Sequence, residues 1–430
     1  MHRLFLTVGL LIPVMAHGGS PFKSIVAADG SGDFTSVQAA VDAAPSGLSE
    51  AWPILVKAGD YNELISIPAD KPFIHLIGQD PANTVIHYMI NQGGKPEEHV
   101  RYDKTTYWKW SFRNPESDNF GKGPAAVMIH APGFYAEDIS FVNDWGAEST
   151  SGPQALAMHS DADRVALSGC VLRSFQDTWR TPNDDSCRNY ARDCRIEGAV
   201  DYMYGGGDVF VENSTFYNLR SGSVIVAPSH GPDTKWGYVI RDCVIDGNAQ
   251  SADGRQKLGR PWQGAPKTVF INTLTFIPVT PQGWDNMGVI PAIFADYNTR
   301  DREGNTPDMS LRKSVYKTRA KGDRPAYEAS CRNSITPEEA ATYTYDNVIR
   351  PSEGWDPRAI SAKLPAPEGL KLENGRLSWL PVEGAAGYIV FDGDRIIATA
   401  TDTEIAIPEV RNSLKVKAVN RFGAKGLPAQ

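Results

Sequence analysis

Two aspartates, Asp177 and Asp201, occupy the same place in an internal repeat of the sequence. Each lies five residues beyond the end of an eight-residue segment, VALSGCVL at 165–172 for the first and NYARDCRI at 189–196 for the second. When two carboxyl groups meet in a partly desolvated site, the pKa of one rises while the other stays ionised. Such a pair could supply an acid and a nucleophile together. For either residue alone, a turn aspartate that satisfies local backbone groups is the structural alternative.

The repeat predicts the element that would bring the two aspartates together. Further segments begin at residues 134, 209, 238 and 269, the last being 269–276, and the six starts lie 31, 24, 20, 29 and 31 residues apart. Each alternates apolar and polar residues around a central Asp, Asn, Gly or Thr. This period is typical of a stacked solenoid, here a right-handed parallel β-helix. Equivalent positions on neighbouring coils would lie about 4.8 Å apart, so Asp177 and Asp201 would form one rung.

Other residues able to do chemistry surround the two aspartates in four short stretches. These are QALAM at 154–158, SFQDTW at 174–179, GAVDYMYG at 198–205 and LGRPW at 258–262. In order and spacing they resemble the four signature segments of the pectin methylesterases, or pectinesterases, and LGRPW is the most specific match. DGSGDF at 29–34 and GDYNE at 59–63 fit the same family. The resemblance covers roughly residues 24–357.

The resemblance implies a carboxylic ester hydrolase that demethylates methyl-esterified galacturonate in pectin and releases methanol, with no metal and no organic cofactor. Asp201 would be the nucleophile that attacks the C6 carbonyl, giving an acyl-enzyme that water hydrolyses. Asp177 would serve as general acid and then as general base. Gln154 and Gln176 would donate side-chain N–H groups to the oxyanion.

Arg260 and Trp262 are expected to act from one face of a strand. Arg260 precedes Pro261, which biases its backbone toward extended geometry, and alternate residues of an extended strand project the same way. The guanidinium would orient Asp201 through charge-assisted hydrogen bonds and contribute to substrate binding, and the indole could stack on a sugar ring.

Tyr204 and Val200 are further candidates for lining the sugar cleft, with core packing as the alternative for Tyr204. The chain departs from the family pattern at the dipeptide Trp179–Arg180 and in two long charged stretches, 91–116 and 183–193. Loops beside a groove select the polymer that fits it, so these stretches bear on substrate preference.

Three other functions share part of the pattern. A β-helical glycosidase also uses paired acids, and a separation of about 5 Å would suit a retaining mechanism. A lyase would need calcium-binding acidic clusters and a basic residue, and a binding solenoid would need no catalytic set. Gln154, Gln176 and Arg260 favour acyl transfer, which requires oxyanion donors and an anchored nucleophile. The sequence has no G-x-S-x-G, H-E-x-x-H or C-x-x-C motif.

The N-terminus predicts an exported enzyme, periplasmic or secreted, and we expect it to work as a monomer. Residues 1–16 combine Arg3, an apolar run at 4–14 and a Val-Met-Ala end, which is typical of a secretory signal peptide, with a buried first strand as the alternative. No other apolar run reaches about 18 residues, which argues against a membrane span. The net charge of -8, without a basic stripe, argues against a nucleic-acid partner.

The cysteines favour packed thiols over disulfides. Cys170, Cys194 and Cys243 share the sixth position of their segments, where the other coils have Ile139, Ser214 and Leu274. A position shared by Cys, Ile and Leu reads as a buried ladder. The pair Cys187 and Cys194 remains open as a disulfide.

The expected organisation is a signal peptide at 1–16, a catalytic β-helix at 17–360, a Pro- and Ala-rich linker at 361–368 and a small C-terminal β-sandwich at 369–430. A short helix after Ser36 should cap the stack, and a capping box at Thr336 predicts a helix through about Tyr345. The C-terminal stretch resembles a truncated fibronectin type III or immunoglobulin-like module with Trp379 and Tyr388 in its core. It could pack on the catalytic domain, act as a spacer or bind carbohydrate.

Overall fold

The computed structural model describes residues 19–92, 125–148, 154–350, 354–407, 411 and 413–429. The predicted signal peptide and most of the charged stretch 91–116 lie outside these ranges. The chain divides into two compact units. One is formed by Phe22–Ala362 with Phe422–Ala424, and the other mainly by Lys363–Arg421 and Lys425–Gln430.

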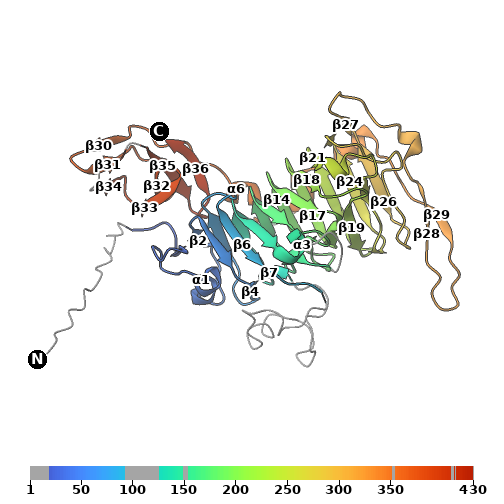
Figure 1. The fold of residues 1–430 in the computed structure, drawn as a ribbon, viewed down its shortest axis with the longest axis horizontal. Coiled ribbons are helices and arrows are strands. Elements are labelled where there is room, and N and C mark those ends of the chain that lie inside the picture. Colours follow the sequence, from blue (N-terminus) through green and yellow to red (C-terminus); the bar gives the residue numbers. More distant parts are fainter. Residues whose placement is uncertain are drawn as a thin grey trace, which may run out of the picture. The chain divides into compact units, whose positions relative to one another are not determined.

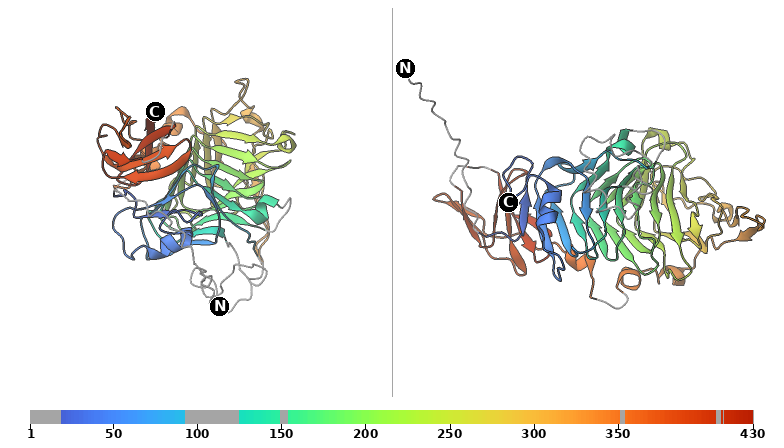
Figure 2. Two further views of the ribbon diagram at one scale, coloured as in Figure 1. Left: turned by 60° about the vertical axis from the view of Figure 1, so that its left-hand side comes forward. Right: turned by 90° about the horizontal axis from the view of Figure 1, so that it is seen from below.

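The larger unit is a parallel β-helix, as predicted, whose coils follow one another along a single stack (Figure 1, Figure 2). Its strands form three parallel sheets in the described ranges. The first sheet contains β1 (Ser24–Val26), β2 (Trp52–Val56), β5 (Ile74–Gly78), β8 (Tyr135–Glu137), β11 (Val165–Ser168), β14 (Arg188–Arg192), β17 (Asp208–Glu212), β20 (Tyr238–Arg241), β24 (Lys267–Ile271) and β26 (Ile293–Tyr297). The second contains β3 (Gly59–Asn62), β6 (Thr84–Tyr88), β9 (Ser140–Asn143), β12 (Val171–Arg173), β15 (Arg195–Gly198), β18 (Thr215–Asn218), β21 (Val244–Gly247), β25 (Leu274–Thr275) and β27 (Arg300–Asp301).

The third sheet carries the predicted catalytic residues. It runs in the order β4 (Ile65–Ile67), β7 (Ala125–Ile129), β10 (Leu156–Ser160), β13 (Trp179–Arg180), β16 (Val200–Gly205), β19 (Val224–His230) and β22 (Lys257–Gly259), with β23 (Gln263–Gly264) also paired to β19. Its inward side chains, among them Trp179, Met203 and Val226, belong to the main hydrophobic core. The outer face of this sheet is therefore the one that remains for a site.

The repeat segments pair in the predicted register, except the last. Val165 pairs with Asn189, Asn189 with Val209, and Val209 with Tyr238. Tyr238 then pairs with Thr268, so the last segment begins one residue earlier than predicted.

The turn between the first and second sheets explains this shift. Its corner residue is held at a positive φ of 49–54° in the coils of Asp138, Asp193, Asn213, Asp242 and Asn272. Asp and Asn tolerate this left-handed conformation better than most residues. The corner therefore sets the register through Asn272. The sixth position of that coil is Thr273 in place of the predicted Leu274, whose side chain is 41% exposed.

The cysteine ladder is confirmed. Cys170, Cys194 and Cys243 are buried, and all five cysteines of the chain are free thiols. The disulfide between Cys187 and Cys194 that the sequence left open is not formed. Burial raises the pKa of the Cys243 thiol to about 12.

Short helices flank the stack. They are α1 (Val37–Ala43), α3 (Asp144–Glu148), α4 (Pro337–Ala340), α5 (Tyr345–Ile349) and α6 (Pro357–Ile360), with 3-10 helices η2 (Ala249–Ser251) and η3 (Met309–Leu311). The Ser36 side chain caps α1 as predicted. The capping box at Thr336 also forms, but its helix stops at Ala340 and a new one begins at Tyr345. The Thr344 side chain accepts a hydrogen bond from the Asn347 N–H, which caps the new helix and separates the two.

The smaller unit consists of two antiparallel sheets. One contains β30 (Lys371–Glu373), β31 (Arg376–Ser378) and β34 (Glu404–Ala406), and the other contains β32 (Ala385–Asp392), β33 (Arg395–Ala400), β35 (Leu414–Asn420) and β36 (Lys425–Ala429). Trp379 and Tyr388 lie in its core with ring centroids 5.1 Å apart. Within the residues described, neither unit has a helix with the length and apolar character of a membrane span.

Candidate active site

The parallel pairing of the third sheet sets the two aspartates side by side. Gln176 forms a bridge with Val200, and Trp179 pairs with Met203. Asp177 and Asp201 lie at matching positions between these two pairs. Both have positive φ, 65° and 49° respectively, in place of regular extended backbone.

A β-bulge accounts for the way the side chains of β16 divide between core and surface. The register of β16 against β19 shifts between Val200 and Met203. A bulge bends the strand and re-aims side chains next to it. Tyr202 and Met203 consequently both belong to the main core, whereas Asp201 and Tyr204 line a pocket on the outer face.

Gly198 allows the chain to enter this bulge. A Cβ atom at position 198 would lie 2.2 Å from Cβ of Tyr202 and 2.9 Å from Oγ1 of Thr178. Real Cβ atoms do not approach other atoms so closely, so only glycine fits. The first glycine of the GAVDYMYG stretch is therefore required by the local packing that presents Asp201.

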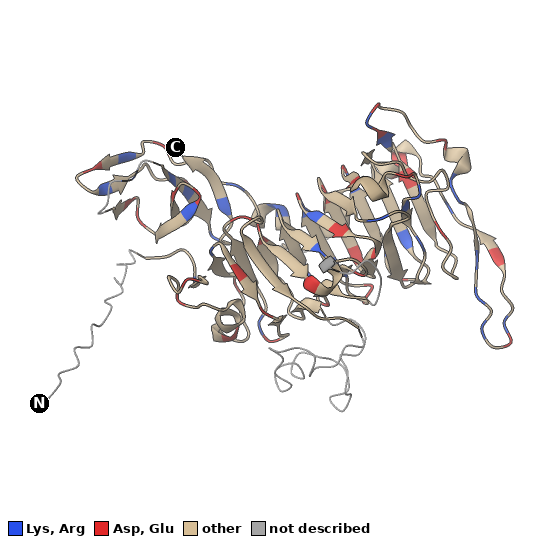
Figure 3. Cartoon of the chain, in the orientation of Figure 1, with Lys and Arg blue, Asp and Glu red and all other residues tan. Residues whose placement is uncertain are grey.

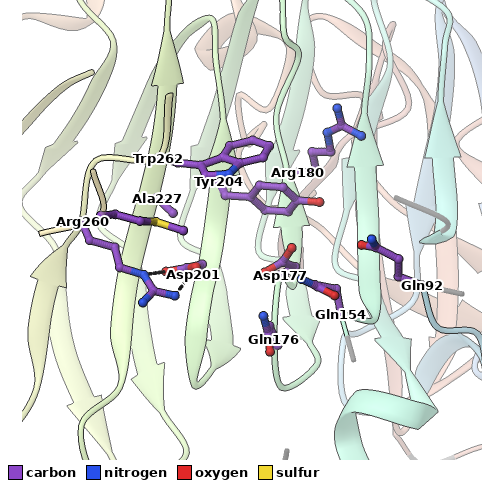
Figure 4. A pocket seen from close by; sticks show the side chains of 11 residues that line it. Gln92, Gln154, Gln176, Asp177, Arg180, Asp201, Tyr204, Ala227, Arg260 and Trp262 are labelled. Atoms are coloured by element: carbon purple, nitrogen blue, oxygen red, sulfur yellow. Dashed lines mark hydrogen bonds and ion pairs between the residues drawn. The ribbon is translucent and has the colours of Figure 1, made fainter. Parts of the chain in front are cut away.

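The pocket has a volume of about 290 Å³ and crosses several coils (Figure 4). Its lining consists of Gln92, Gln154, Gln176, Asp177, Arg180, Asp201, Tyr204, Ala227, Arg260, Trp262 and Met287. Figure 4 shows Asp177 and Asp201 directed into the same space, with Arg260 beside Asp201 and the two amides Gln154 and Gln176 beside Asp177.

Seven of the eight residues expected at the site line the pocket, and Val200 does not. The seven are Gln154, Gln176, Asp177, Asp201, Tyr204, Arg260 and Trp262. Val200 packs against Phe175 and Ala199. The bulge after Val200 and the positive φ of Asp201 give these two neighbouring side chains different surroundings, so that Asp201 faces the pocket and Val200 does not.

Four lining residues were not predicted. Arg180 pairs in register with Tyr204, three residues beyond each aspartate, and that equal spacing is a signal that the sequence already contained. Ala227 pairs with Tyr204 from β19. Gln92 and Met287 come from segments outside the regular strands, and no periodic pattern pointed to them.

Arg260 holds Asp201 through two parallel hydrogen bonds. Nε of Arg260 donates to Oδ1 of Asp201 at 2.8 Å, and Nη2 donates to Oδ2 at 2.7 Å. Backbone pairing fixes the arginine, because its N–H donates to the carbonyl of Val226 at 3.0 Å. A bidentate pair of this kind is strong and fixes orientation as well as charge.

The two carboxyl groups differ in their electrostatic surroundings. Burial raises the pKa of Asp201, and the hydrogen bonds and positive charge of Arg260 oppose that rise. Burial and then the neighbouring Asp201 raise the pKa of Asp177 well above its usual range, against weaker opposing effects of Arg260, Tyr204 and Arg180. Both oxygens of Asp201 accept from a cation, which favours its ionised form, whereas the surroundings of Asp177 favour its protonated form.

Aromatic side chains form another wall of the pocket. The rings of Tyr204 and Trp262 meet edge to face, with centroids 5.4 Å apart. The guanidinium of Arg180 lies 6.0 Å from the centroid of Tyr204 on β16. The pocket thus combines a carboxyl group paired with a cation, a carboxyl group whose pKa is raised well above its usual range, two side-chain amides and an aromatic surface. Such a set can support nucleophilic and acid–base chemistry on a sugar derivative.

Comparisons with known proteins agree on one family. The family model described as Pectinesterase matches residues 23–108 and 111–313. Pectinesterase 31 of Arabidopsis thaliana is 33% identical over 263 residues, which cover 61% of this chain and 76% of that protein. Pectin methylesterase from carrot has a TM-score of 0.58 at 23% identity, covering 80% of this chain and 95% of the carrot chain. A pectin methylesterase solved in complex with a hexasaccharide has the same TM-score at 22% identity, covering 78% of this chain and 98% of that one.

The two solved structures are too distant in sequence to show more than the shared fold, and that fold is the parallel β-helix described above. The family model, in contrast, matches more than half of the 430 residues. This chain therefore belongs to the pectinesterase family.

Proposed function

We propose that this chain demethylates pectin with Asp201 as its nucleophile and Asp177 as its general acid and base. As a pectinesterase, the chain is a carboxylic ester hydrolase that acts on methyl-esterified galacturonate. The observation that carries the residue assignment is the bidentate Asp201–Arg260 pair. This pair favours the ionised form of Asp201 and fixes its orientation, directly beside Asp177, whose pKa is raised.

The first half of the reaction forms an acyl-enzyme. An Asp201 oxygen attacks the C6 carbonyl carbon of the ester, and the carbonyl electrons move to oxygen. Gln154 and Gln176 donate N–H groups to that oxyanion, a type of contact whose loss typically costs about 3–4 kcal/mol of barrier. When the intermediate collapses, the bond to the methoxy oxygen breaks, Asp177 gives its proton to that oxygen and methanol leaves.

The second half hydrolyses the acyl-enzyme. Asp177 is now a carboxylate and takes a proton from an entering water molecule, while the water oxygen bonds to the acyl carbon. Collapse of this second intermediate releases galacturonate and returns Asp201 as an anion held by Arg260. One methanol and one free carboxyl group form per ester, and Asp177 is again protonated.

Trp262 and Tyr204 are proposed to bind the sugar, because their edge-to-face rings form an aromatic wall beside the charged and amide side chains of the pocket. Arg260 would contribute to binding from the same side. The solved relative that contains a hexasaccharide supports an extended galacturonan as the ligand here.

The wider organisation is also proposed. Two antiparallel sheets packed around Trp379 and Tyr388 support a fibronectin type III or immunoglobulin-like sandwich at 369–430, after a linker at 361–368 and a catalytic domain at 17–360. The signal-like composition of 1–16 supports export of the enzyme to the periplasm or the medium, where it would act as a monomer.

The test is methanol release from highly methylated pectin, with reducing ends counted in the same samples. The wild type should release methanol and no new reducing ends. Asp201→Ala and Asp177→Ala should each lose methanol release. New reducing ends without methanol would select the glycosidase reading and reject the esterase, and full activity in either variant would reject that residue's role.

A further inference from the structure

A basic hairpin projects from the β-helix at the C-terminal end of the stack (Figure 1). Its arms are β28 (Val315–Lys317) and β29 (Glu328–Ser330), which pair antiparallel. Near its tip, Lys321 and Arg324 exchange two backbone hydrogen bonds of 3.0 and 3.2 Å. The segment 315–330 is thus an ordered two-arm element and is called the basic hairpin below.

The charge of the basic hairpin is opposite to that of the whole chain. Four of its side chains are basic and two are acidic, although the chain carries a net charge of -8. The basic ones are exposed, and they are Lys317, Arg319, Lys321 and Arg324. Of these four side chains, Lys317 alone has a carboxylate within ion-pair distance among the residues that the structure describes, and that partner is Glu328 at 4.0 Å. Figure 3 shows basic residues at several places along the hairpin.

The base of the basic hairpin is joined to the wall of the catalytic pocket. Met287 lines that pocket. On either side of it, Asn286 accepts a hydrogen bond on Oδ1 from the Lys317 N–H at 2.9 Å, and the Gly288 carbonyl accepts one from the Arg319 N–H at 3.2 Å.

The Arg319 side chain also packs directly over Gly288. A Cβ at Gly288 would lie 2.6 Å from Cγ and 2.7 Å from Nε of Arg319, and the backbone there has a φ of 99°. A side chain at position 288 would meet Arg319, so glycine allows the arginine to lie next to the pocket residue Met287.

The basic hairpin continues the direction in which the pocket runs. The pocket crosses the coils of β10, β13, β16 and β19 and reaches Arg260 just after β22. Beyond β22, parallel bridges join Gly259 to Trp284 and Gly288 to Thr318. Each bridge is a further step along the stack, so a polymer that lies in the pocket and passes Met287 meets the basic hairpin next.

We propose that the basic hairpin is a second binding site, which takes the free carboxylates of demethylated galacturonan beyond the catalytic pocket. This inference rests on the proposed function for the identity of the polymer. Methyl esters are neutral and their hydrolysis products are anions, so a row of Lys and Arg distinguishes demethylated stretches from methylated ones. The site favours substrates that already carry a demethylated block on the side of Met287.

The test compares two triple variants. In Arg319→Gln/Lys321→Gln/Arg324→Gln the basic hairpin loses three charges, and in the control Arg255→Gln/Lys363→Gln/Lys371→Gln three exposed charges elsewhere are lost. Calorimetry measures binding of fully demethylated polygalacturonate, which has no ester to cleave. Because each exposed charge pair contributes only modestly, affinity at low salt should fall about tenfold on loss of the three charges in the hairpin variant. The control should change it less than about twofold, and added salt should remove the difference.

Kinetics separate this site from the catalytic pocket. For partly demethylated pectin, the hairpin variant should show a raised KM and an unchanged kcat, and its KM for fully methylated pectin should equal that of the wild type. The double variant Lys321→Gln/Arg324→Gln keeps the packing of Arg319 over Gly288 and should show an intermediate loss.

Three outcomes would overturn the inference: unchanged affinity for polygalacturonate, an equal loss in the control, or the same rise in KM on both substrates. Failure of the proposed function would appear differently, as absence of methanol release by the wild type while the basic hairpin still bound polygalacturonate.

Discussion

Replacing Arg260 by glutamine removes the cation that holds Asp201. Two hydrogen bonds, of 2.8 and 2.7 Å, are lost from Asp201, whose side chain is only 8% exposed. Hydrogen bonds to charged groups contribute about 1.5–3 kcal/mol each, and breaking a buried pair typically costs about 3–5 kcal/mol. If about 3–4 kcal/mol of this is lost from the ionised, productive form of Asp201, kcat/KM should fall roughly 10²- to 10³-fold.

The pH profile of Arg260→Gln should move in a direction that the structure dictates. Arg260 opposes the rise in the pKa of Asp201 that burial causes, so its removal raises that pKa further. Asp201 must be ionised to attack, and the acidic limb of kcat/KM should therefore shift to higher pH. Arg260→Lys keeps the charge but loses the planar fork, so it should fall between the wild type and Arg260→Gln.

Arg312 supplies a matched control for this experiment. It forms a second bidentate pair outside the pocket, in which Nε and Nη2 donate to the two oxygens of Asp296 at 3.0 and 2.9 Å. Arg312→Gln should lower the melting temperature and leave kcat/KM per folded molecule unchanged. Methanol release measured from pH 4 to 9 for all four proteins would decide the matter. Equal losses of activity in Arg260→Gln and Arg312→Gln, or an acidic limb that does not move, would refute the reasoning.

Three further outcomes are expected. Arg180→Gln should raise the pKa of Asp177, because Arg180 helps to lower it, and the alkaline limb of the pH–rate profile should move to higher pH. Asp177→Asn should raise the melting temperature by about 1–2 °C at pH 7. Folding raises the pKa of Asp177, so this residue contributes fully to the stability of the fold below its unfolded pKa, and that contribution is lost as pH rises through its folded pKa. The gain in melting temperature from Asp177→Asn should therefore vanish at pH 4. Gly198→Ala should destabilise the fold by about 2 kcal/mol or more in urea unfolding, since its Cβ would lie 2.2 Å from Tyr202.

Periodic features of the site could be predicted from the sequence. The equal spacing of Asp177 and Asp201 from their repeat segments places them on one rung, and parallel pairing in the structure does the same. The same spacing argument applied three residues further on would have found Arg180. Val200, predicted as a residue of the sugar cleft, packs against Phe175 and Ala199 at the point where the strand becomes irregular.

Features that depend on irregular backbone could not be predicted. The bulge after Val200 breaks the alternation that would otherwise place Tyr202 and Tyr204 on one face. In the last coil, apolar matching aligned residue 269 with Tyr238, whereas the left-handed corner at Asn272 decided the register. Met287 reaches the pocket from a segment without regular strand structure, for which the sequence has no period.

The central claim is that Asp201 forms the acyl-enzyme, and trapping that intermediate tests it most directly. The wild type is mixed with a fully methylated oligogalacturonide in the presence of hydroxylamine, which converts an activated carboxyl group into a stable hydroxamate. The protein is then digested and the masses of its peptides are measured by mass spectrometry. The account predicts a hydroxamate at Asp201 that is absent without substrate and absent in Arg260→Gln on the same timescale. A hydroxamate at Asp177 with none at Asp201 would contradict it.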